Sequence, residues 1–285
     1  APKLAPATLT SYRNNFRVHI KPYVGEIPLR ELTTYHIQKM LDGIGGSLST
    51  FVKNYNVIHG ALEKAVELGM IPRNPCKGVA FPADDKGDMR VLTQEEQQRF
   101  IAALDGEYYK VMLLTYLYTG MRAGECIPLQ WKDVDLNKRT IRVNKKAILN
   151  HDFTKHSAKQ EIQDFCKTKS SKRTVAITAG LTAILTEHKE NMRERAEALG
   201  LDWSEDSLVF WNTRNKIVQY SNLKESLNKV YRKAGIEGAT MHTLRHTYAT
   251  RCFEAGVDIK AISEQLGHAN VKTTYNIYVH LLDDT

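Results

Sequence analysis

A chain of 285 residues exceeds the usual size of one domain, and its 42% of hydrophobic residues can form ordinary globular cores, so we expect two domains. The net charge of +8 favours nucleic acid over acidic or neutral partners, and it is uneven, because residues 1–82 hold ten Lys or Arg against five Asp or Glu. The four cysteines are scattered, which excludes a disulfide framework and a zinc site. The sequence lacks a long apolar stretch and a leader, which excludes a membrane protein, so we expect a soluble, cytoplasmic protein.

The first 80 residues predict helices joined by short turns. Over residues 8–20, apolar side chains recur at three- and four-residue steps, which lines one face of a helix. Thr34 is expected to cap a second helix, and Ser49 or Thr50 a third and longer one that stops before Pro72. Together these elements predict a small all-helical unit.

A segment without apolar periodicity separates this unit from the next. Residues 81–88 combine Pro, Gly and charge, which is typical of an interdomain linker. Thr93 and Glu96 then have the spacing of a capping box, which marks the start of a new helix. We therefore expect a helical domain at residues 1–82, a linker at 83–91 and a second domain at 92–285.

The second domain is predicted to begin and end with helices around a small sheet. An apolar helix over residues 108–118 is broken by Gly120, which places Arg122 in an interhelical turn. Strands on either side of Asn137, and another at 174–177 after a polar hairpin, predict one small antiparallel sheet. Further helices are expected at 181–199, 222–234, 243–255, 258–266 and around Tyr278. The predicted fold class is thus mainly α with a small antiparallel β-sheet.

Short motifs in this domain carry the groups needed to attack a phosphodiester. Arg122 lies in Thr-Gly-Met-Arg-Ala-Gly-Glu, His242 and Arg245 lie in His-Thr-Leu-Arg-His, and His268 ends a Leu-Gly-His motif that precedes Tyr278. Two guanidinium groups can neutralise a phosphodiester, histidines can donate hydrogen bonds or move protons, and a tyrosine hydroxyl can attack phosphorus. Such a set can break and rejoin DNA without a metal.

In the order of these motifs the chain resembles the tyrosine recombinases, the family of phage and transposon integrases, over nearly its whole length. The resemblance implies a helical core-binding domain joined to an α+β catalytic domain. It implies that Arg122 and Arg245 hold the scissile phosphate, with Glu125 supporting Arg122. His242 would take or share the tyrosine proton, and His268 would donate a hydrogen bond to a non-bridging oxygen.

The resemblance also chooses between two tyrosines. The family's Thr-Thr-x-x-x-Tyr-x-His arrangement falls on Tyr278, which makes this residue the expected nucleophile. Tyr275, three residues earlier, then occupies a variable position. His246 stands four residues after His242, as in a zinc pair, but no third ligand follows at a recognisable spacing, so we expect no metal.

A lysine in the hairpin before the 174–177 strand is the expected proton donor to the leaving 5′ oxygen. The family pattern Lys-Thr-x-x-Ser-x-Arg selects Lys167, with Lys169 as the alternative. For Lys169, Lys172 and Arg173 the better interpretation is a basic hairpin that contacts the DNA backbone.

The expected reaction passes through a 3′-phosphotyrosine and a free 5′ hydroxyl, with no ATP or cofactor. Exchange between two double-stranded DNA sites needs four active sites, so we expect monomers that assemble into a homo-tetramer on DNA and form a Holliday junction. Directionality factors and host DNA-bending proteins are candidate further partners. Family members often carry a small arm-binding domain before this point, so we expect an N-terminally truncated chain, and the seven residues after Tyr278 suggest a short or trimmed C-terminal tail.

Three rival interpretations are weaker. A type IB topoisomerase also forms a 3′-phosphotyrosine, but the helical N-terminal unit and the Leu-Gly-His motif argue against it. A DNA-binding regulator with an inactive site does not need all six catalytic-type residues. A metal-dependent nuclease or phosphatase needs an acidic cluster, which the sequence lacks. The long hairpin over 145–173 favours an integrase of a phage or conjugative transposon over a resolvase of chromosome dimers.

Overall fold

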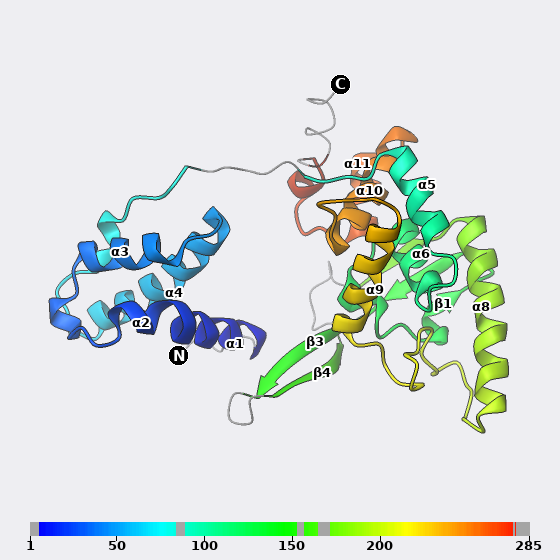
Figure 1. The fold of residues 1–285 in the computed structure, drawn as a ribbon, viewed down its shortest axis with the longest axis horizontal. Coiled ribbons are helices and arrows are strands. Elements are labelled where there is room, and N and C mark those ends of the chain that lie inside the picture. Colours follow the sequence, from blue (N-terminus) through cyan, green and yellow to red (C-terminus); the bar gives the residue numbers. More distant parts are fainter. Residues whose placement is uncertain (1–5, 84–88, 153–156, 165–171, 276, 278–285) are drawn as a thin grey trace. The chain divides into compact units, whose positions relative to one another are not determined.

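The computed structural model describes residues 6–83, 89–152, 157–164, 172–275 and 277. The chain forms two compact units, one made of residues 1–87 and 149–159 and one made of residues 88–148 and 160–285 (Figure 1). The division falls inside the segment expected to be a linker. Within the described residues, no helix is both long and apolar enough to cross a membrane.

The first unit is a bundle of helices around its own core. Its main elements are α1 (Pro6–Asn15), α2 (Lys21–Val24), α3 (Thr34–Ile44) and α4 (Leu48–Glu67). Single 3₁₀ turns cover Leu29–Glu31 and Pro75–Gly78. The α3 and α4 helices pack against each other through apolar residues such as Ile37, Met40 and Ile58. The small all-helical unit predicted from the sequence is confirmed.

The first helix differs from the expected one in its buried face. A π-helical turn, Phe16–Ile20, separates α1 from α2, and Leu9 and Phe16 are 39% and 50% exposed, whereas Asn15 and Ile20 are buried. Pro22 follows this turn, and its ring would clash with the carbonyl of the residue four positions earlier in a regular helix. The wider turn takes the chain out of the regular 3.6-residue period after Asn15, so the single helix expected over residues 8–20 is replaced by α1 and this turn.

Two helix starts in the first unit also lie slightly earlier than predicted. Thr33, rather than Thr34, caps α3, with its backbone N–H donating to Nδ1 of His36 at 3.2 Å. The Thr34 hydroxyl instead donates to the carbonyl of Pro75 at 2.8 Å. Ser47 precedes the first residue of α4.

The second unit contains the helices that carry the candidate site. They are α5 (Gln94–Ala103), α6 (Lys110–Thr119), α7 (Ala123–Cys126), α8 (Ala179–Ala198), α9 (Tyr220–Lys233), α10 (Met241–Glu254) and α11 (Ile259–Leu266). The capping box of Thr93 and Glu96 at the start of α5 is confirmed. Gly120 ends α6 in the left-handed conformation, so Arg122 lies in an interhelical turn, as expected.

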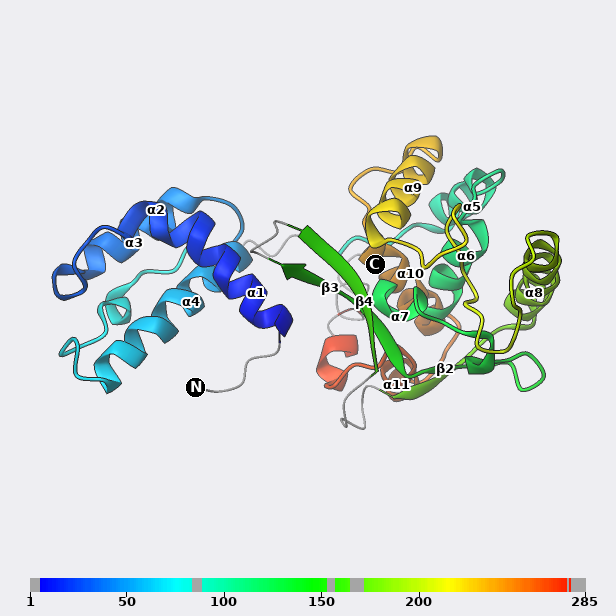
Figure 2. The same cartoon turned by 90° about the horizontal axis from the view of Figure 1, so that it is seen from below.

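A small antiparallel sheet completes this unit. Its order is β1 (Val134–Asp135), β2 (Thr140–Val143) and β5 (Arg173–Ala176), with Val143 paired to Arg173. The predicted sheet is therefore confirmed. The hairpin between β2 and β5 forms a separate two-stranded sheet of β3 (Lys145–Asp152) and β4 (Ser157–Asp164), seen from below in Figure 2.

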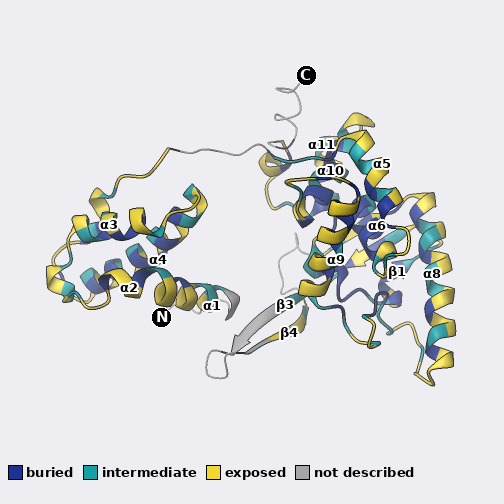
Figure 3. Ribbon diagram, in the orientation of Figure 1, coloured by how far each residue is buried: buried dark blue, intermediate teal, exposed yellow. Residues whose placement is uncertain are grey.

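The α6 helix is the centre of the second unit. It is apolar on every side and is buried over most of its length, which is typical of a helix inside a core. It packs against α8 and α10, and α10 also packs against α11 (Figure 3). The helices that carry the candidate residues are therefore supported by a buried core.

Candidate active site

Arg122 is held at the turn between α6 and α7. Its Nη1 donates to Oε1 of Glu125 at 3.0 Å, and its Nη2 donates to the carbonyl of Gly267 at 3.2 Å. Its backbone N–H donates to Oε2 of the same Glu125 at 2.8 Å. The side chain is 44% exposed, so the guanidinium is oriented by two protein groups while part of it still faces solvent.

Glu125 is a buried carboxylate with two arginine partners. Arg173 donates to it from Nη1 at 3.1 Å and from Nη2 at 2.8 Å, a bidentate pair. Burial by itself raises the pKa of the Glu125 carboxyl, but the hydrogen bonds and charges of Arg173 and then Arg122 outweigh it and lower the pKa. Glu125 therefore stays ionised and fixes Arg122, in agreement with the supporting role expected for it.

Arg245 is almost completely buried on α10. Its guanidinium donates from Nη1 to the carbonyl of Gly120 and from Nη2 to the carbonyl of Leu266, both at 2.6 Å. Burial, and then the nearby charge of Arg122, lower the pKa of Arg245, which remains protonated at neutral pH. An arginine carries five N–H donors, so this double anchor leaves others available to an anion.

His242 and His246 lie on the same helix as Arg245. His242 is exposed, and partial desolvation followed by the charges of Arg245 and Arg122 lowers its pKa. A neutral imidazole can accept a proton, which suits the role expected of His242. The ring of His246 is 6.2 Å from that of His242, and the buried Nδ1 of His246 has no hydrogen-bond partner among the residues that the structure describes.

His268 follows the left-handed residue Gly267 that ends α11. Its Nδ1 shares a hydrogen bond of 2.7 Å with the hydroxyl of Thr274, a residue with no exposed surface. Burial, then the charges of Arg245 and Arg122, lower the pKa of His268 to about 4. His268 is thus a neutral, oriented imidazole at neutral pH.

The structure therefore brings together four of the predicted residues, Arg122, His242, Arg245 and His268. They come from the turn after α6, from α10 and from the turn after α11. The carbonyl of Gly267 accepts from Arg122, and the carbonyls of Gly120 and Leu266 accept from Arg245. Two guanidinium groups and two neutral imidazoles at one place can bind a phosphate diester and stabilise added charge on it.

Three predicted residues, Lys167, Lys169 and Tyr278, lie outside the described residues. Tyr275 lies in a helical segment and is 51% exposed.

Two residues of the basic hairpin, Lys172 and Arg173, have different surroundings. Lys172 is exposed, as a DNA-contacting residue requires. The Arg173 side chain is only 8% exposed and is occupied by Glu125, so this position does not fit the expected contact with the DNA backbone. The sequence interpretation assigned Arg173 to the DNA backbone together with Lys169 and Lys172, whereas the structure pairs it with the buried carboxylate of Glu125.

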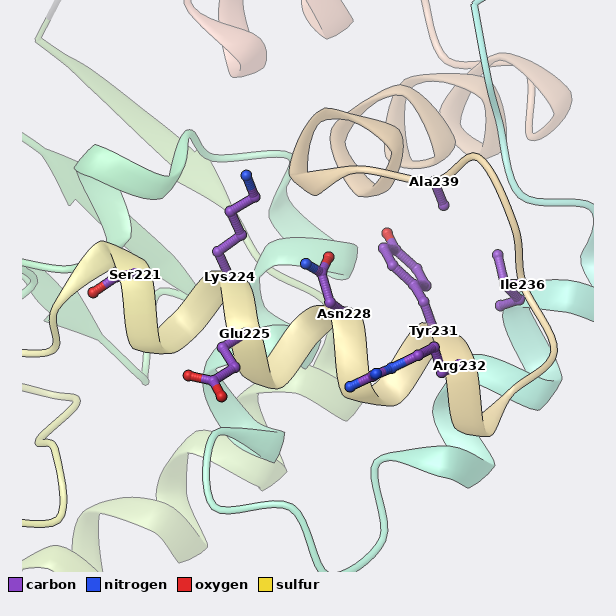
Figure 4. A pocket seen from close by; sticks show the side chains of 8 residues that line it. All are labelled: Ser221, Lys224, Glu225, Asn228, Tyr231, Arg232, Ile236 and Ala239. Atoms are coloured by element: carbon purple, nitrogen blue, oxygen red, sulfur yellow. The ribbon is translucent and has the colours of Figure 1, made fainter.

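Other hollows and clusters do not add to this chemistry. A hollow of about 570 Å³ lies beside α9. Figure 4 shows side chains that line it, among them Lys224, Glu225 and Tyr231. The hydroxyl of Tyr231 donates to the carbonyl of Thr240 at 2.9 Å and so supports the start of α10. Within the described part of the chain, no group of three or more His, Cys, Asp or Glu side chains is arranged to hold a metal ion.

Comparison with known proteins gives this arrangement a family. The pattern described as "Phage integrase family" matches residues 90–285, more than half of the chain. The chain belongs to the phage integrase family. The pattern described as "Phage integrase, N-terminal SAM-like domain" matches residues 1–44 of this integrase.

Relatives of the integrase include proteins of bacteria and of mobile elements. A "Tyrosine recombinase XerC-like" protein of Caldanaerobacter subterraneus subsp. tengcongensis is 31% identical, over 97% of this chain and 75% of its own length. The "ICEBs1 integrase" of Bacillus subtilis is 28% identical, over 92% of this chain and 69% of its own. The resemblance seen in the motifs is thus confirmed by similarity over nearly the whole chain.

Solved structures share the fold of the integrase. The Tn1549 transposon integrase in complex with a circular intermediate DNA superposes with a TM-score of 0.80 at 18% identity, over 97% of this chain and 90% of that one. A lambda integrase tetramer bound to a Holliday junction gives a TM-score of 0.69 at 17% identity, over 97% and 73% of the two chains. The mainly helical fold with small antiparallel sheets is therefore that of integrases.

Proposed function

We propose that this integrase is a site-specific DNA recombinase that integrates and excises a mobile element, a transposon or a phage. The observation that carries the proposal is the convergence of Arg122, Arg245, His242 and His268 on one place, with both arginines anchored by backbone carbonyls. Its relatives are named as tyrosine recombinases and integrases, which supports the same reaction.

The first step is attack on the scissile phosphate by Tyr278. Its oxygen forms a bond to phosphorus while the bond from phosphorus to the 5′ oxygen breaks, which leaves a 3′-phosphotyrosine. Arg122 and Arg245 carry the extra negative charge of the five-coordinate phosphorus, and such preorganised charge is usually the largest contribution to catalysis. We assign proton transfer to the leaving 5′ oxygen to Lys167, with Lys169 as the alternative.

The two histidines act on the proton of the tyrosine and on the phosphate. Because its pKa is lowered, His242 is neutral and accepts or shares the proton of Tyr278. His268 donates a hydrogen bond to a non-bridging oxygen, and the hydroxyl of Thr274 at its Nδ1 leaves Nε2 for that contact. The reverse reaction, attack of a 5′ hydroxyl from another strand, rejoins the DNA, so neither ATP nor a cofactor is consumed.

Double-stranded recombination sites are the proposed partner, with residues 1–82 as the core-binding domain and 92–285 as the catalytic domain. A lambda integrase tetramer has been seen on a Holliday junction, which supports assembly of this chain as a tetramer on DNA. Directionality factors and host DNA-bending proteins are the further partners that we propose. Because the basic N-terminal unit contacts phosphates in this scheme, binding should weaken steeply with salt.

The test is covalent capture on nicked duplexes that lose a short 5′ fragment after cleavage. A pool with randomised centres is incubated with the protein in EDTA, adducts are resolved on a denaturing gel, and the captured sequences are amplified for later assays. The wild type and Tyr275→Phe are expected to form the adduct, and Tyr278→Phe is expected to form none. Loss of the adduct in Tyr275→Phe alone would identify Tyr275, and not Tyr278, as the nucleophile. Tight binding of the duplex without any adduct would favour a DNA-binding regulator.

A further inference from the structure

Arg173 is an interior arginine at the first position of β5. All of its guanidinium nitrogens are engaged, since Nε donates to the carbonyl of Gln265 at 2.6 Å and both Nη atoms donate to Glu125. The backbone N–H of Ala176, further along the strand, donates to Oε1 of Gln265 at 2.9 Å. Arg173 thereby ties the end of α11 to the sheet and to Glu125.

The same guanidinium fills the space beside Gly267. A Cβ at Gly267 would lie 2.9 Å from Nη1 and 3.0 Å from Cζ of Arg173, so only glycine leaves room for this contact. The carbonyl of Gly267 accepts from Arg122, and His268 is the next residue. Arg173 therefore touches both the carboxylate and the turn that orient groups of the site.

We propose that Arg173 is a positioning residue that aims Arg122 through Glu125 and fixes the turn that carries His268. This inference rests on the proposed recombinase function. Arg173 does not touch DNA in this role, because its side chain is nearly enclosed and each of its three guanidinium nitrogens already donates to a protein group. Without it, Glu125 would keep, among the described residues, only Arg122 as an ion-pair partner, and a buried carboxylate with one cation removed relaxes towards solvent or towards its remaining partner.

A double-mutant cycle tests whether Arg173 acts through Glu125. The variants are Arg173→Gln, Glu125→Gln and the double variant, with Arg173→Lys as the conservative replacement. For each, we would measure the single-turnover rate of adduct formation at saturating captured duplex and, separately, the Kd for the same duplex. We expect each single change to slow the adduct roughly ten- to a hundred-fold, as small misplacements of catalytic groups do, with little change in Kd. The double variant should be no slower than the slower single one.

A matched control separates positioning from simple destabilisation. Arg142 on β2 pairs at 2.9 Å with Asp133, another buried carboxylate, and neither residue belongs to the site. Arg142→Gln should lower the urea midpoint of unfolding but leave the adduct rate within about two-fold, since Arg142 and Arg173 lie on neighbouring strands but, among the described residues, share no hydrogen-bond partner. Arg173→Lys, which keeps one charge without the bidentate fork, should recover part of the rate lost in Arg173→Gln.

Two kinetic outcomes would overturn the inference: an unchanged rate in folded Arg173→Gln, or independent, multiplicative losses in the cycle. A measurement without DNA keeps it separate from the proposed function. The Nε–H signal of Arg122 in the spectrum of ¹⁵N-arginine-labelled protein, assigned by its loss in Arg122→Lys, should shift in Arg173→Gln and not in Arg142→Gln. If the wild type formed no adduct but this signal shifted, the recombinase proposal would fail while the positioning role stood. An unshifted signal would refute the role itself.

Discussion

Gly120 is the point at which the fold leaves least room near the site. It has φ of +60°, and a Cβ there would lie 2.5 Å from Cδ1 of Tyr248 and 2.7 Å from Cδ2 of Leu266. Its carbonyl and that of Leu266 are the two acceptors that hold Arg245. Gly120→Ala should therefore cost stability and also disturb the arginine.

A matched glycine isolates the steric part of this cost. Gly235 has φ of +65° but no atom within 4 Å of the position of a Cβ. Gly235→Ala should cost only the left-handed conformation, about 1–2 kcal/mol. Gly120→Ala adds overpacking, which typically costs about 1–3 kcal/mol more.

Tryptophan fluorescence during urea unfolding measures the difference. Trp131, Trp203 and Trp211 are all the tryptophans of the chain and lie in the second unit, so the signal reports that unit alone. With a slope of about 2 kcal/mol per molar urea, the midpoint of Gly120→Ala should lie roughly 0.5–1.5 M below that of Gly235→Ala. The adduct rate should also fall in Gly120→Ala and stay near wild type in Gly235→Ala. Equal midpoints for the two variants would refute the close packing around Gly120.

Three further changes test the site itself. The pKa of Glu125 is lowered in the folded state, so the stabilisation that its carboxylate gives is complete above the ordinary value of 4.5 and is lost as the pH falls through the lowered value. The urea midpoints of the wild type and Glu125→Gln should therefore differ more at neutral pH than in acid. A difference that does not depend on pH would contradict this. Thr274→Val removes the hydrogen-bond partner of Nδ1 of His268, so it should destabilise the second unit by about 1–3 kcal/mol and slow adduct formation. Thr274→Ser keeps the hydroxyl and should preserve both the stability and the rate. Equal behaviour of the two variants would argue against the hydrogen bond. On the same captured duplex, Arg122→Lys should lower the rate of adduct formation about a hundred-fold or more, because an ammonium lacks the guanidinium's planar fork of donors. The stability of the protein should change little. A wild-type rate in this variant would exclude Arg122 from the reaction.

The sequence predicted most clearly those features that depend on neighbouring residues. The Thr93 and Glu96 capping box is local, and so is the break at Gly120 that leaves Arg122 in a turn. The motif order was sufficient to select Arg122 and Arg245, although their separation along the chain gave no indication of the carbonyls that hold them.

Features that depend on tertiary contacts escaped prediction. The burial of Arg173 follows from Glu125, which lies 48 positions earlier, and no periodicity relates the two. The π-helical turn before Pro22 was also missed. A proline ring clashes with the carbonyl four residues earlier in a regular helix, but the interpretation of residues 8–20 followed the regular helical period and left Pro22 out. The partnership of His268 with Thr274 likewise needs the turn between them. A buried acidic residue near a catalytic arginine is the signal that should prompt a search for a second cation.

The most direct test of the central claim is to locate the covalent bond between protein and DNA. After capture in EDTA and digestion of the DNA, trypsin cleavage after Lys272 would release the segment Thr273–Thr285, which contains both Tyr275 and Tyr278. Fragmentation of this peptide in a mass spectrometer should place a 3′-linked nucleotide on Tyr278. A nucleotide on Tyr275, a 5′ linkage, or an unmodified peptide beside cleaved DNA would contradict the account.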